Sequence, residues 1–345
     1  MSARVVLITG VSRYLGGRLA AELSRDESIE RLIGVDVVPP RADVGRTEFV
    51  RADIRNPIIA KVIASAQVDT VVHMSVIATP YGAGGRTAMK EINVIGTMQL
   101  LAACQKAPSV RKLVVKSTTA VYGSSSRDPA LFTENMEPRR LPGSGYGKDS
   151  VEVEGYVRGL GRRRPDVDVA LLRFANFIGP SIDTPLTRYF ALPVVPKVLG
   201  FDPRIQFVHV DDGLEVLRRA VVEDHRGTFN VAGDGVMLLS QAIRRAGRMS
   251  VPFPSPAVSF VGSMFRRTGL VDFSPEQLLF LQFGRGVDTT RLREDFGYVP
   301  RFSTLAAFDD FVEGSGLEPV VDPDKIESVG RLVAGFAGSL GGGRA

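Results

Sequence analysis

The first half of the chain alternates short apolar runs with segments of helical periodicity, and this alternation limits the possible folds more than any other feature. Six segments have the length and composition of strands: VVLIT (5–9), RLIGVD (31–36), TEFVRAD (47–53), VDTVVHM (68–74), RKLVVKST (111–118) and VDVALLRF (167–174). Helical patterns lie between them, such as the one that carries Leu15, Leu19 and Leu23. Apolar strands separated by helices indicate a parallel sheet that is buried on both faces. We therefore expect an α/β fold with a Rossmann-type doubly wound parallel sheet.

The texture of the sequence changes after Asn176, where prolines begin to interrupt the pattern. We expect a Rossmann domain over 1–176 and a smaller C-terminal substrate-binding lobe over 177–320. Two strand-like segments of that lobe, IQFVHV and GTFNVA, are expected to return to the main sheet. In the tail, 321–345, one helical face carries Ile326, Val329, Val333, Phe336 and Leu340. We interpret the tail as a docking helix, with a weak membrane or partner contact as the alternative.

Composition excludes several classes of protein. No stretch approaches the ~20 apolar residues of a membrane span, and the N-terminal MSARVVLITG enters a strand pattern without the regions of a signal peptide. A lone cysteine, Cys104, cannot form an internal disulfide and fits a reducing compartment. We therefore expect a cytoplasmic protein with no membrane span.

Charge and histidine spacing exclude two further classes of site. The net charge of +5 comes mostly from arginine clusters, two of which (162–164 and 244–245) follow helical patterns, where cations offset the helix dipole. No aromatic residues interleave with them, so we expect no nucleic-acid partner. His73, His209 and His225 lie too far from one another and from Cys104 for a metal site.

A glycine-rich segment, Thr9-Gly10-Val11-Ser12-Arg13-Tyr14-Leu15-Gly16-Gly17, follows the first strand and opens the first helix. In such a turn, backbone N–H groups and the helix dipole approach a pyrophosphate. Asp36 ends the second strand, where a carboxylate binds the ribose hydroxyls of NAD and repels the 2′-phosphate of NADP. These residues predict NAD as the cofactor. Arg13 adds bulk and charge beside the phosphates, which leaves NADP open.

With these motifs the sequence resembles the extended short-chain dehydrogenase/reductase family, and within it bacterial UDP-glucose 4-epimerase-like proteins. The glycine pattern of that family is TGxxGxxG, with Arg13 here at the middle glycine. Further matching segments are VDTVVHMS (68–75), EINVIGTMQLLAA (91–103), STTAVYG (117–123), LRFANFIGP (172–180), FVHVDD (207–212) and GTFNVAGDG (227–235). The resemblance implies a cofactor site formed by Gly10, Ser12, Arg13, Tyr14, Leu15, Gly16, Asp36, Asp53, Ile54, Met74, Ser75, Asn93 and Tyr146, with Asp53 near the adenine.

The resemblance also implies a catalytic pair. Thr118 matches the family hydroxyl residue and Tyr146 matches the tyrosine of YxxxK, which acts as general base or acid. The family lysine, which lowers the tyrosine pKa and holds the nicotinamide ribose, is replaced by Ser150. Lys148 is a poor substitute, because at ~100° per residue a helix turns position i+2 away from the tyrosine. We therefore expect Lys148 to be solvated.

Lys116 is the other candidate for the missing cation. It precedes Thr118 by two residues on the fifth strand, so the two side chains leave the same face. A strand rises ~3.3 Å per residue and a helix 1.5 Å, so Lys116 and Ser150 are expected at similar depth below Thr118 and Tyr146. We hypothesise that Lys116 faces Ser150 and restores the positive charge. The alternative is a structural lysine bound to another buried acceptor.

For the substrate, the resemblance suggests Asn176, Arg204 and Arg285, of which Arg204 is one place off the family arginine. Asn93 is open to a second interpretation, a bridge between helix and strand backbones. His73 and His209 are interpreted as packed, hydrogen-bonded histidines.

The resemblance implies an NAD-dependent epimerase, dehydratase or oxidoreductase that acts on a nucleotide sugar, and a homodimer. Because the lysine and the middle glycine are missing, a catalytically retired NAD-binding sensor or scaffold stays open. A reductase of a small carbonyl compound is a third possibility, which predicts release of NADH during turnover.

Overall fold

The computed structural model describes residues 4–78, 84–255 and 275–320. Its centre is a seven-stranded parallel sheet with the strand order β11-β6-β5-β4-β1-β2-β3. The strands are β1 (Val5–Thr9), β2 (Arg31–Asp36), β3 (Glu48–Arg51), β4 (Thr70–His73), β5 (Lys112–Thr118), β6 (Asp168–Phe174) and β11 (Gly227–Val231). The predicted doubly wound α/β sheet is confirmed. Its strand order reverses between β1 and β4, and open sheets of this kind bind ligands at such a point.

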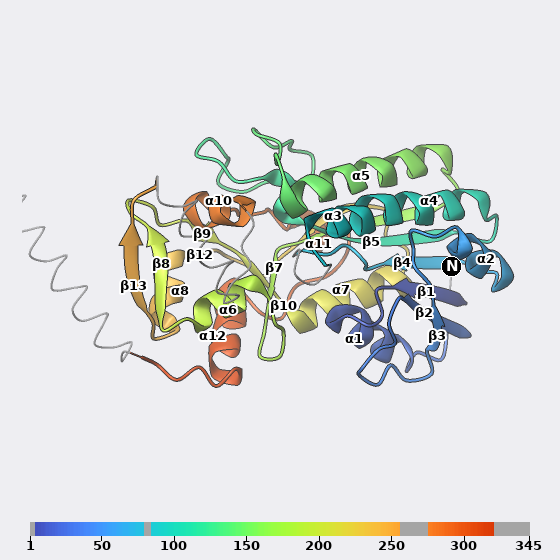
Figure 1. Ribbon diagram of the computed structural model, residues 1–345, viewed down its shortest axis with the longest axis horizontal. Helices are drawn as coiled ribbons and strands as arrows, with labels where there is room; N and C mark the ends of the chain where they lie inside the picture. Colours follow the sequence, from blue (N-terminus) through green and yellow to red (C-terminus); the bar gives the residue numbers. More distant parts are fainter. Residues whose placement is uncertain (1–3, 79–83, 256–274, 321–345) are drawn as a thin grey trace, which may run out of the picture.

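Helices cover both faces of the sheet (Figure 1). On one face lie α1 (Tyr14–Leu23) and α7 (Val210–Val222); on the other lie α2 (Ile58–Ser65), α4 (Thr97–Lys106) and α5 (Gly145–Arg163). Because strand side chains alternate, each strand feeds two cores. Val114 of β5 packs in the core with Leu19 and Leu214 of α1 and α7, whereas Val115 packs in the core with Val153 of α5.

The segment before α4 is helical throughout, from α3 (Arg86–Lys90) through a π-helical stretch, Glu91–Gly96. Cys104 of α4 is fully buried, and burial raises the pKa of its thiol to about 12. Arg162 and Arg163 lie in the last turn of α5, and Arg244 and Arg245 in the last turn of α8 (Leu239–Arg245), as expected. Within the described part of the chain, no helix is long and apolar enough to cross a membrane.

A smaller lobe follows β6. It is built from β7 (Asn176–Ile178), α6 (Pro185–Ala191), β8 (Val194–Val198), β9 (Arg204–Ile205), β10 (Phe207–His209), β12 (Met237–Leu238), α8, β13 (Met249–Phe253), α10 (Pro275–Phe283), α11 (Thr290–Glu294) and α12 (Thr304–Gly314). The strands pair as β10–β7, β12–β9 and β13–β8. A core of its own includes Phe190, Phe207 and Phe308.

The two strands expected to return to the main sheet behave differently. GTFNVA forms β11 and pairs with β6. IQFVHV does not join the sheet, and that expectation was wrong: its β10 pairs with β7 instead. The reason is that β11 already occupies the free edge of β6, with the Ala175 N–H donating to Val231 O at 2.9 Å. The predicted tail helix, 321–345, and a further arginine pair of the sequence, Arg266 and Arg267, lie outside the described residues.

Candidate active site

The glycine turn lies between β1 and α1 and leaves room for an anion. Gly10 has a φ of +76°, which favours glycine, and a Cβ on Gly16 would lie 2.2 Å from Gly10 O. Arg13, the N-cap of α1, makes no side-chain cap hydrogen bond, so first-turn N–H groups remain available to a ligand. The turn therefore fits the pyrophosphate of a dinucleotide.

Asp36 reaches from the end of β2 to this turn. Its Oδ2 accepts from the Ser12 N–H at 3.1 Å and from the Ser12 hydroxyl, and its Oδ1 accepts from the Val37 N–H at 2.8 Å. A carboxylate at this place fits a ribose hydroxyl. Asp53, the expected adenine contact, is bound by Arg55, whose Nη2 donates to Asp53 Oδ2 at 2.6 Å.

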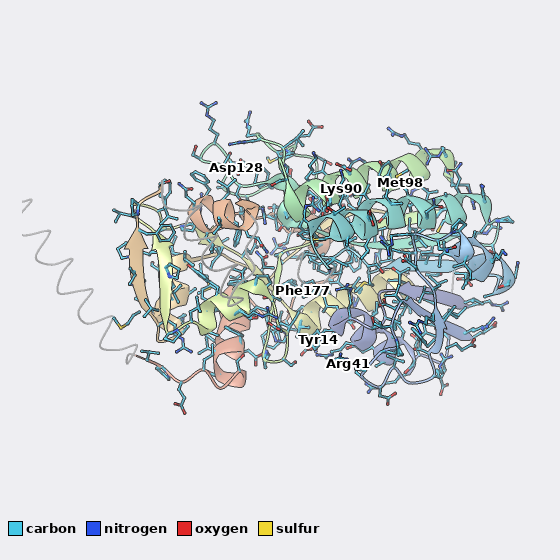
Figure 2. All side chains as sticks on the ribbon, viewed as in Figure 1. Tyr14, Arg41, Lys90, Met98, Asp128 and Phe177 are labelled. Carbon is cyan, nitrogen blue, oxygen red and sulfur yellow. The ribbon has the colours of Figure 1, made fainter. Side chains whose placement is uncertain are left out.

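A cavity of about 510 Å³ opens where the sheet meets the lobe, a volume suited to a small molecule. Tyr14 and Phe177 mark this junction in Figure 2. The polar lining includes Arg13, Lys116, Thr118, Tyr146, Asn176, Asp183, Thr184 and Arg285, and the apolar lining includes Leu15, Met74, Phe177, Ile182, Leu186 and Phe280. The glycine loop and the predicted catalytic pair thus face one cavity.

Tyr146 is the second residue of α5 and lies at the cavity wall. Burial raises the pKa of its phenol to about 12, against the opposing effects of hydrogen bonds with the Thr118 and Ser150 side chains and of the Arg285 charge. Ser150 is buried, and its hydroxyl donates to Tyr146 O at 2.8 Å. On balance these effects favour the protonated phenol.

Lys116 does not face Ser150, so this part of the hypothesis was wrong. Side chains of β5 alternate, and Ser117 is the one that points at α5, where its hydroxyl donates to Glu154 Oε1 at 2.7 Å. Lys116 leaves the opposite face and its ammonium lies 5.9 Å from the centre of the Phe177 ring. Burial, and then the charge of Arg13, lower the Lys116 pKa to about 8. Lys148 is exposed, as expected.

The remaining predicted residues divide into two groups. Asn176 and Arg285 line the cavity, whereas Arg204 is exposed on β9 and is absent from the cavity lining, so this cavity gives its predicted substrate role no support. Asn93 is fully buried and bridges backbones: Oδ1 accepts from the Ile77 N–H at 2.7 Å and Nδ2 donates to Ile77 O at 2.9 Å. Asn93 thus ties its helix to the loop after β4, close to the bridging interpretation, and its cofactor contact stays a prediction.

Three other predicted cofactor residues lie close to the strand ends. Met74 is buried and lines the cavity. Ser75 lies beside Gly10, since a Cβ there would meet Ser75 Oγ at 3.0 Å. Ile54 packs in the core beneath α4, against Gly96. All three side chains are uncharged, so none of them places a charge near Tyr146.

Residues 6–232 match the sequence profile of the NAD dependent epimerase/dehydratase family. The chain belongs to this family. It is 51% identical to the uncharacterized protein Rv0501 of Mycobacterium tuberculosis (strain ATCC 25618 / H37Rv) over 97% of this chain and 90% of that protein. It is 25% identical to the uncharacterized protein y4nL of Sinorhizobium fredii (strain NBRC 101917 / NGR234), over 88% and 92%. The family is NAD-dependent, and NAD is the cofactor that the glycine turn and Asp36 fit.

Solved structures with this epimerase/dehydratase fold cover most of the chain. MoeE5 in complex with UDP-glucuronic acid and NAD is 20% identical, with a TM-score of 0.70 over 90% of this chain and 99% of that one. UDP-glucose 4-epimerase of Thermotoga maritima, with UDP-glucose, is 19% identical, with a TM-score of 0.69 over 90% and 97%. At these identities the likeness establishes the fold.

One ion pair beside the site, between half-buried Arg86 and buried Asp149, was missed by the sequence analysis of this epimerase/dehydratase-family protein. Arg86 Nη1 and Nη2 donate to the two Asp149 carboxylate oxygens at 2.6 and 2.7 Å, and Nη2 also donates to Gly145 O at 3.1 Å. Asp149 is fully buried on α5, three residues after Tyr146. An acid on the apolar face of a helix was the available signal, because a buried carboxylate needs a partner.

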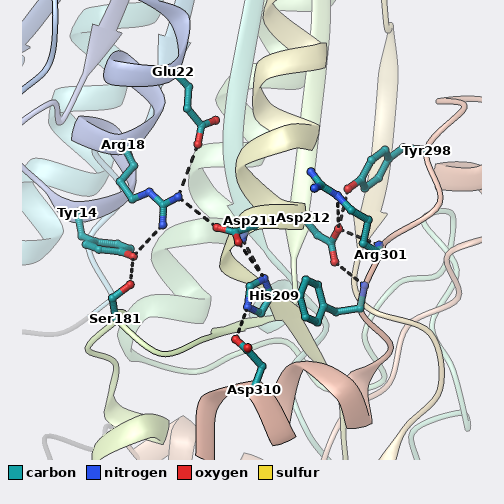
Figure 3. Close-up of polar contacts among 11 residues, drawn as sticks. Tyr14, Arg18, Glu22, Ser181, His209, Asp211, Asp212, Tyr298, Arg301 and Asp310 are labelled. Atoms are coloured by element: carbon teal, nitrogen blue, oxygen red, sulfur yellow. Dashed lines mark hydrogen bonds and ion pairs between the residues drawn. The ribbon is translucent and has the colours of Figure 1, made fainter. Parts of the chain in front are cut away.

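A second polar network joins the glycine helix to the lobe (Figure 3). Tyr14 Oη lies 2.8 Å from Ser181 Oγ, and Arg18 Nη2 donates to Asp211 Oδ1 at 3.1 Å. His209 Nε2 lies 2.9 Å from Asp310 Oδ2, so this histidine is packed and hydrogen-bonded as expected. Of these residues, Tyr14 also lines the cavity.

Proposed function

We propose that the protein is an NAD-dependent epimerase or dehydratase that oxidises, and then returns hydride to, a nucleotide sugar. The observation that carries the proposal is the pairing of Tyr146 with Thr118 in the cavity that the glycine turn also lines. Solved structures of similar fold hold UDP-sugars and NAD, which supports this substrate class. The polar residues Asn176, Asp183 and Thr184 on the lobe side of the cavity are suited to sugar hydroxyls.

In this proposal, Tyr146 moves the proton and Thr118 positions the oxygen. Ionised Tyr146 accepts the proton of the sugar hydroxyl, and the Thr118 hydroxyl donates a hydrogen bond to the same oxygen. NAD, when bound, supplies the acceptor for the hydride that leaves the carbinol carbon. Protonated Tyr146 returns the proton in the reverse half-reaction. The phenol must therefore reach both ionisation states during a cycle.

The test is to saturate the purified protein with NAD, add a panel of nucleotide sugars, and follow NADH absorbance and the sugar products. We expect a sugar-dependent signal and a loss of roughly 10²- to 10⁴-fold in rate for Tyr146→Phe, the usual contribution of a general acid–base group. NAD binding without reduction or conversion of any sugar would support the retired sensor instead. Steady release of NADH with simple alcohols would support the small-carbonyl reductase.

A further inference from the structure

The family lysine near the tyrosine is missing from this chain, and neither neighbouring lysine takes its place. Ser150 occupies the position with a neutral hydroxyl that hydrogen-bonds to Tyr146 O. Lys148 is exposed, and Lys116 leaves the face of β5 opposite to α5 and lies over Phe177. A tyrosine that accepts a proton near neutral pH needs a nearby positive charge, because burial alone disfavours the phenolate.

Arg285 enters the cavity from the lobe and is fixed there by its backbone. Gly284, with a φ of +72°, has no room for a side chain, since a Cβ would lie 2.1 Å from Arg204 O. The Arg285 N–H donates to that same oxygen at 3.0 Å, and Gly286 O accepts from the Phe132 N–H at 2.9 Å. Arg285 is therefore held on both sides by main-chain hydrogen bonds.

The Arg285 side chain ends at the loop that follows Thr118. Its Nη1 donates to Gly123 O at 2.7 Å, and its Nε donates to Thr119 Oγ1 at 3.3 Å. The guanidinium carbon lies 5.1 Å from the centre of the Phe280 ring. These contacts place the cation one residue from the hydroxyl residue that hydrogen-bonds Tyr146, in the same cavity.

Arg285 is one of several charged residues around the cavity. The charged residues in the lining of the described cavity are Arg13, Lys116, Arg140, Asp183 and Arg285. Burial raises the Tyr146 pKa, and of these charged residues Arg285 is the one whose charge opposes that rise. The Arg13 charge acts instead on Lys116, and the Lys116 charge on His73. On α5 itself, Asp149 is paired with Arg86 and Glu154 with Arg173.

We propose that Arg285 is the cation that favours ionised Tyr146 in place of the missing lysine, and thus a positioning residue supplied by the lobe. The inference rests on the proposed role of Tyr146. It reassigns Arg285, whose predicted role was substrate binding, to the electrostatics of the tyrosine. It also places the charge on a segment that is 139 residues beyond Tyr146 in the chain (285 − 146).

The experiment measures Tyr146 ionisation directly and needs no turnover. Difluorotyrosine, whose phenol is more acidic than that of tyrosine, is incorporated in the full chain, and fluorine NMR follows each tyrosine against pH. The Tyr146 resonance is identified by its loss in Tyr146→Phe. The titration is repeated for Arg285→Met, Arg285→Lys and Lys116→Met, with and without NAD. Tertiary folding of each variant is checked by near-ultraviolet circular dichroism.

We expect Arg285→Met to raise the midpoint of Tyr146 ionisation by on the order of one pH unit. Arg285→Lys should return the midpoint most of the way to that of the natural chain, because it retains the charge while losing the planar contacts. Lys116→Met should leave the midpoint of Tyr146 ionisation within a few tenths of a unit of the natural value. An unchanged midpoint in Arg285→Met, or an equal shift in Lys116→Met, overturns the proposal. If Arg285→Met does not fold, Arg285→Gln supplies the same comparison.

The two proposals can fail separately. A midpoint that depends on Arg285 in a protein that converts no sugar supports this inference and removes the proposed function. A protein that converts a sugar, but whose midpoint of Tyr146 ionisation does not depend on Arg285, supports the proposed function and removes this inference.

Discussion

At the scale of single residues, position 150 shows how one substitution redistributes charge. The Ser150 hydroxyl donates a hydrogen bond to the main-chain oxygen of Tyr146, on the same helix, at 2.8 Å. The side chain therefore needs no ligand, and the neighbouring Asp149 is neutralised by Arg86. The two buried polar residues that follow Tyr146 on α5, Asp149 and Ser150, thus have partners within the protein, whereas a lysine at position 150 would add a positive charge.

His73 gives a pH prediction at the same scale. The Thr97 hydroxyl donates to Asn93 O at 2.5 Å, so His73 Nε2, 2.8 Å from Thr97 Oγ1, must carry the hydrogen. Nδ1 then accepts from Thr9 Oγ1 at 3.0 Å, and the ring is neutral. Burial, and then the Lys116 charge, lower the His73 pKa from 6.5 to about 4.

Because the unfolded chain binds a proton between these two pKa values and the folded chain does not, the free energy of unfolding falls as pH drops from 6.5 toward 4. Between pH 7 and pH 5 we expect His73 to account for about 2 kcal/mol of that loss. Urea unfolding at the two pH values, for the natural chain and His73→Gln, isolates the effect. Equal pH slopes in the two proteins would contradict the prediction.

The residues of the cofactor turn and the catalytic pair were predictable from the sequence, but the face of the sheet on which a strand side chain lies was not. Gly10, Asp36, Thr118 and Tyr146 follow from motif spacing, and the structure brings Thr118 and Tyr146 together. Lys116 was placed on the wrong face, because the spacing of side chains along a strand says nothing about which face of the sheet a later helix covers. The ion pair of Asp149 could not be predicted either, because its partner Arg86 is distant in the sequence.

At the scale of elements, α5 carries a matched pair of glycines. A Cβ on Gly155 would have no neighbour within 4 Å, whereas a Cβ on Gly147 would lie 2.9 Å from Ala120 O and 3.1 Å from Pro142. We expect Gly155→Ala to stabilise the fold by about 0.5–1 kcal/mol, because it lowers the entropy of the unfolded chain.

Gly147→Ala is expected to destabilise by about 1–3 kcal/mol, because the backbone of the loop after β5 must move. Denaturant unfolding of both variants measures these changes. A Gly147→Ala protein as stable as Gly155→Ala would show that the start of α5 moves freely against that loop.

Element identity was largely predictable, and pairing was not. All six strand-like runs of the first half became strands of the sheet, because apolar composition and length suffice for a buried parallel strand. IQFVHV has the same composition, yet its β10 pairs with β7. Competition for the edge of β6 is decided by β11, which comes later in the chain.

At the scale of the whole molecule, the boundary proposed at residue 176 divides a continuous core. The core on one face of the sheet joins Val6 and Ile8 of β1 to Leu214 of α7 and Phe229 of β11. A fragment of residues 1–176 lacks that helix and that strand, so α1 alone covers this face of its sheet. We expect the fragment not to fold cooperatively, although it contains six of the seven sheet strands.

Circular dichroism during thermal unfolding of the fragment tests this, with the full chain as control. A fragment with a sharp, reversible transition would mean that the sheet domain is independent of α7 and β11.

The buried Cys104 makes the natural chain a ready background for spectroscopy, because the sequence contains no other thiol. A cysteine placed at exposed Lys148 and another at exposed Val194 of β8 would take dyes while Cys104 stays unlabelled in the native state. The dye pair would span the sheet domain and the lobe. Energy transfer between them would then report, molecule by molecule, whether the two parts approach each other when NAD or a sugar is added.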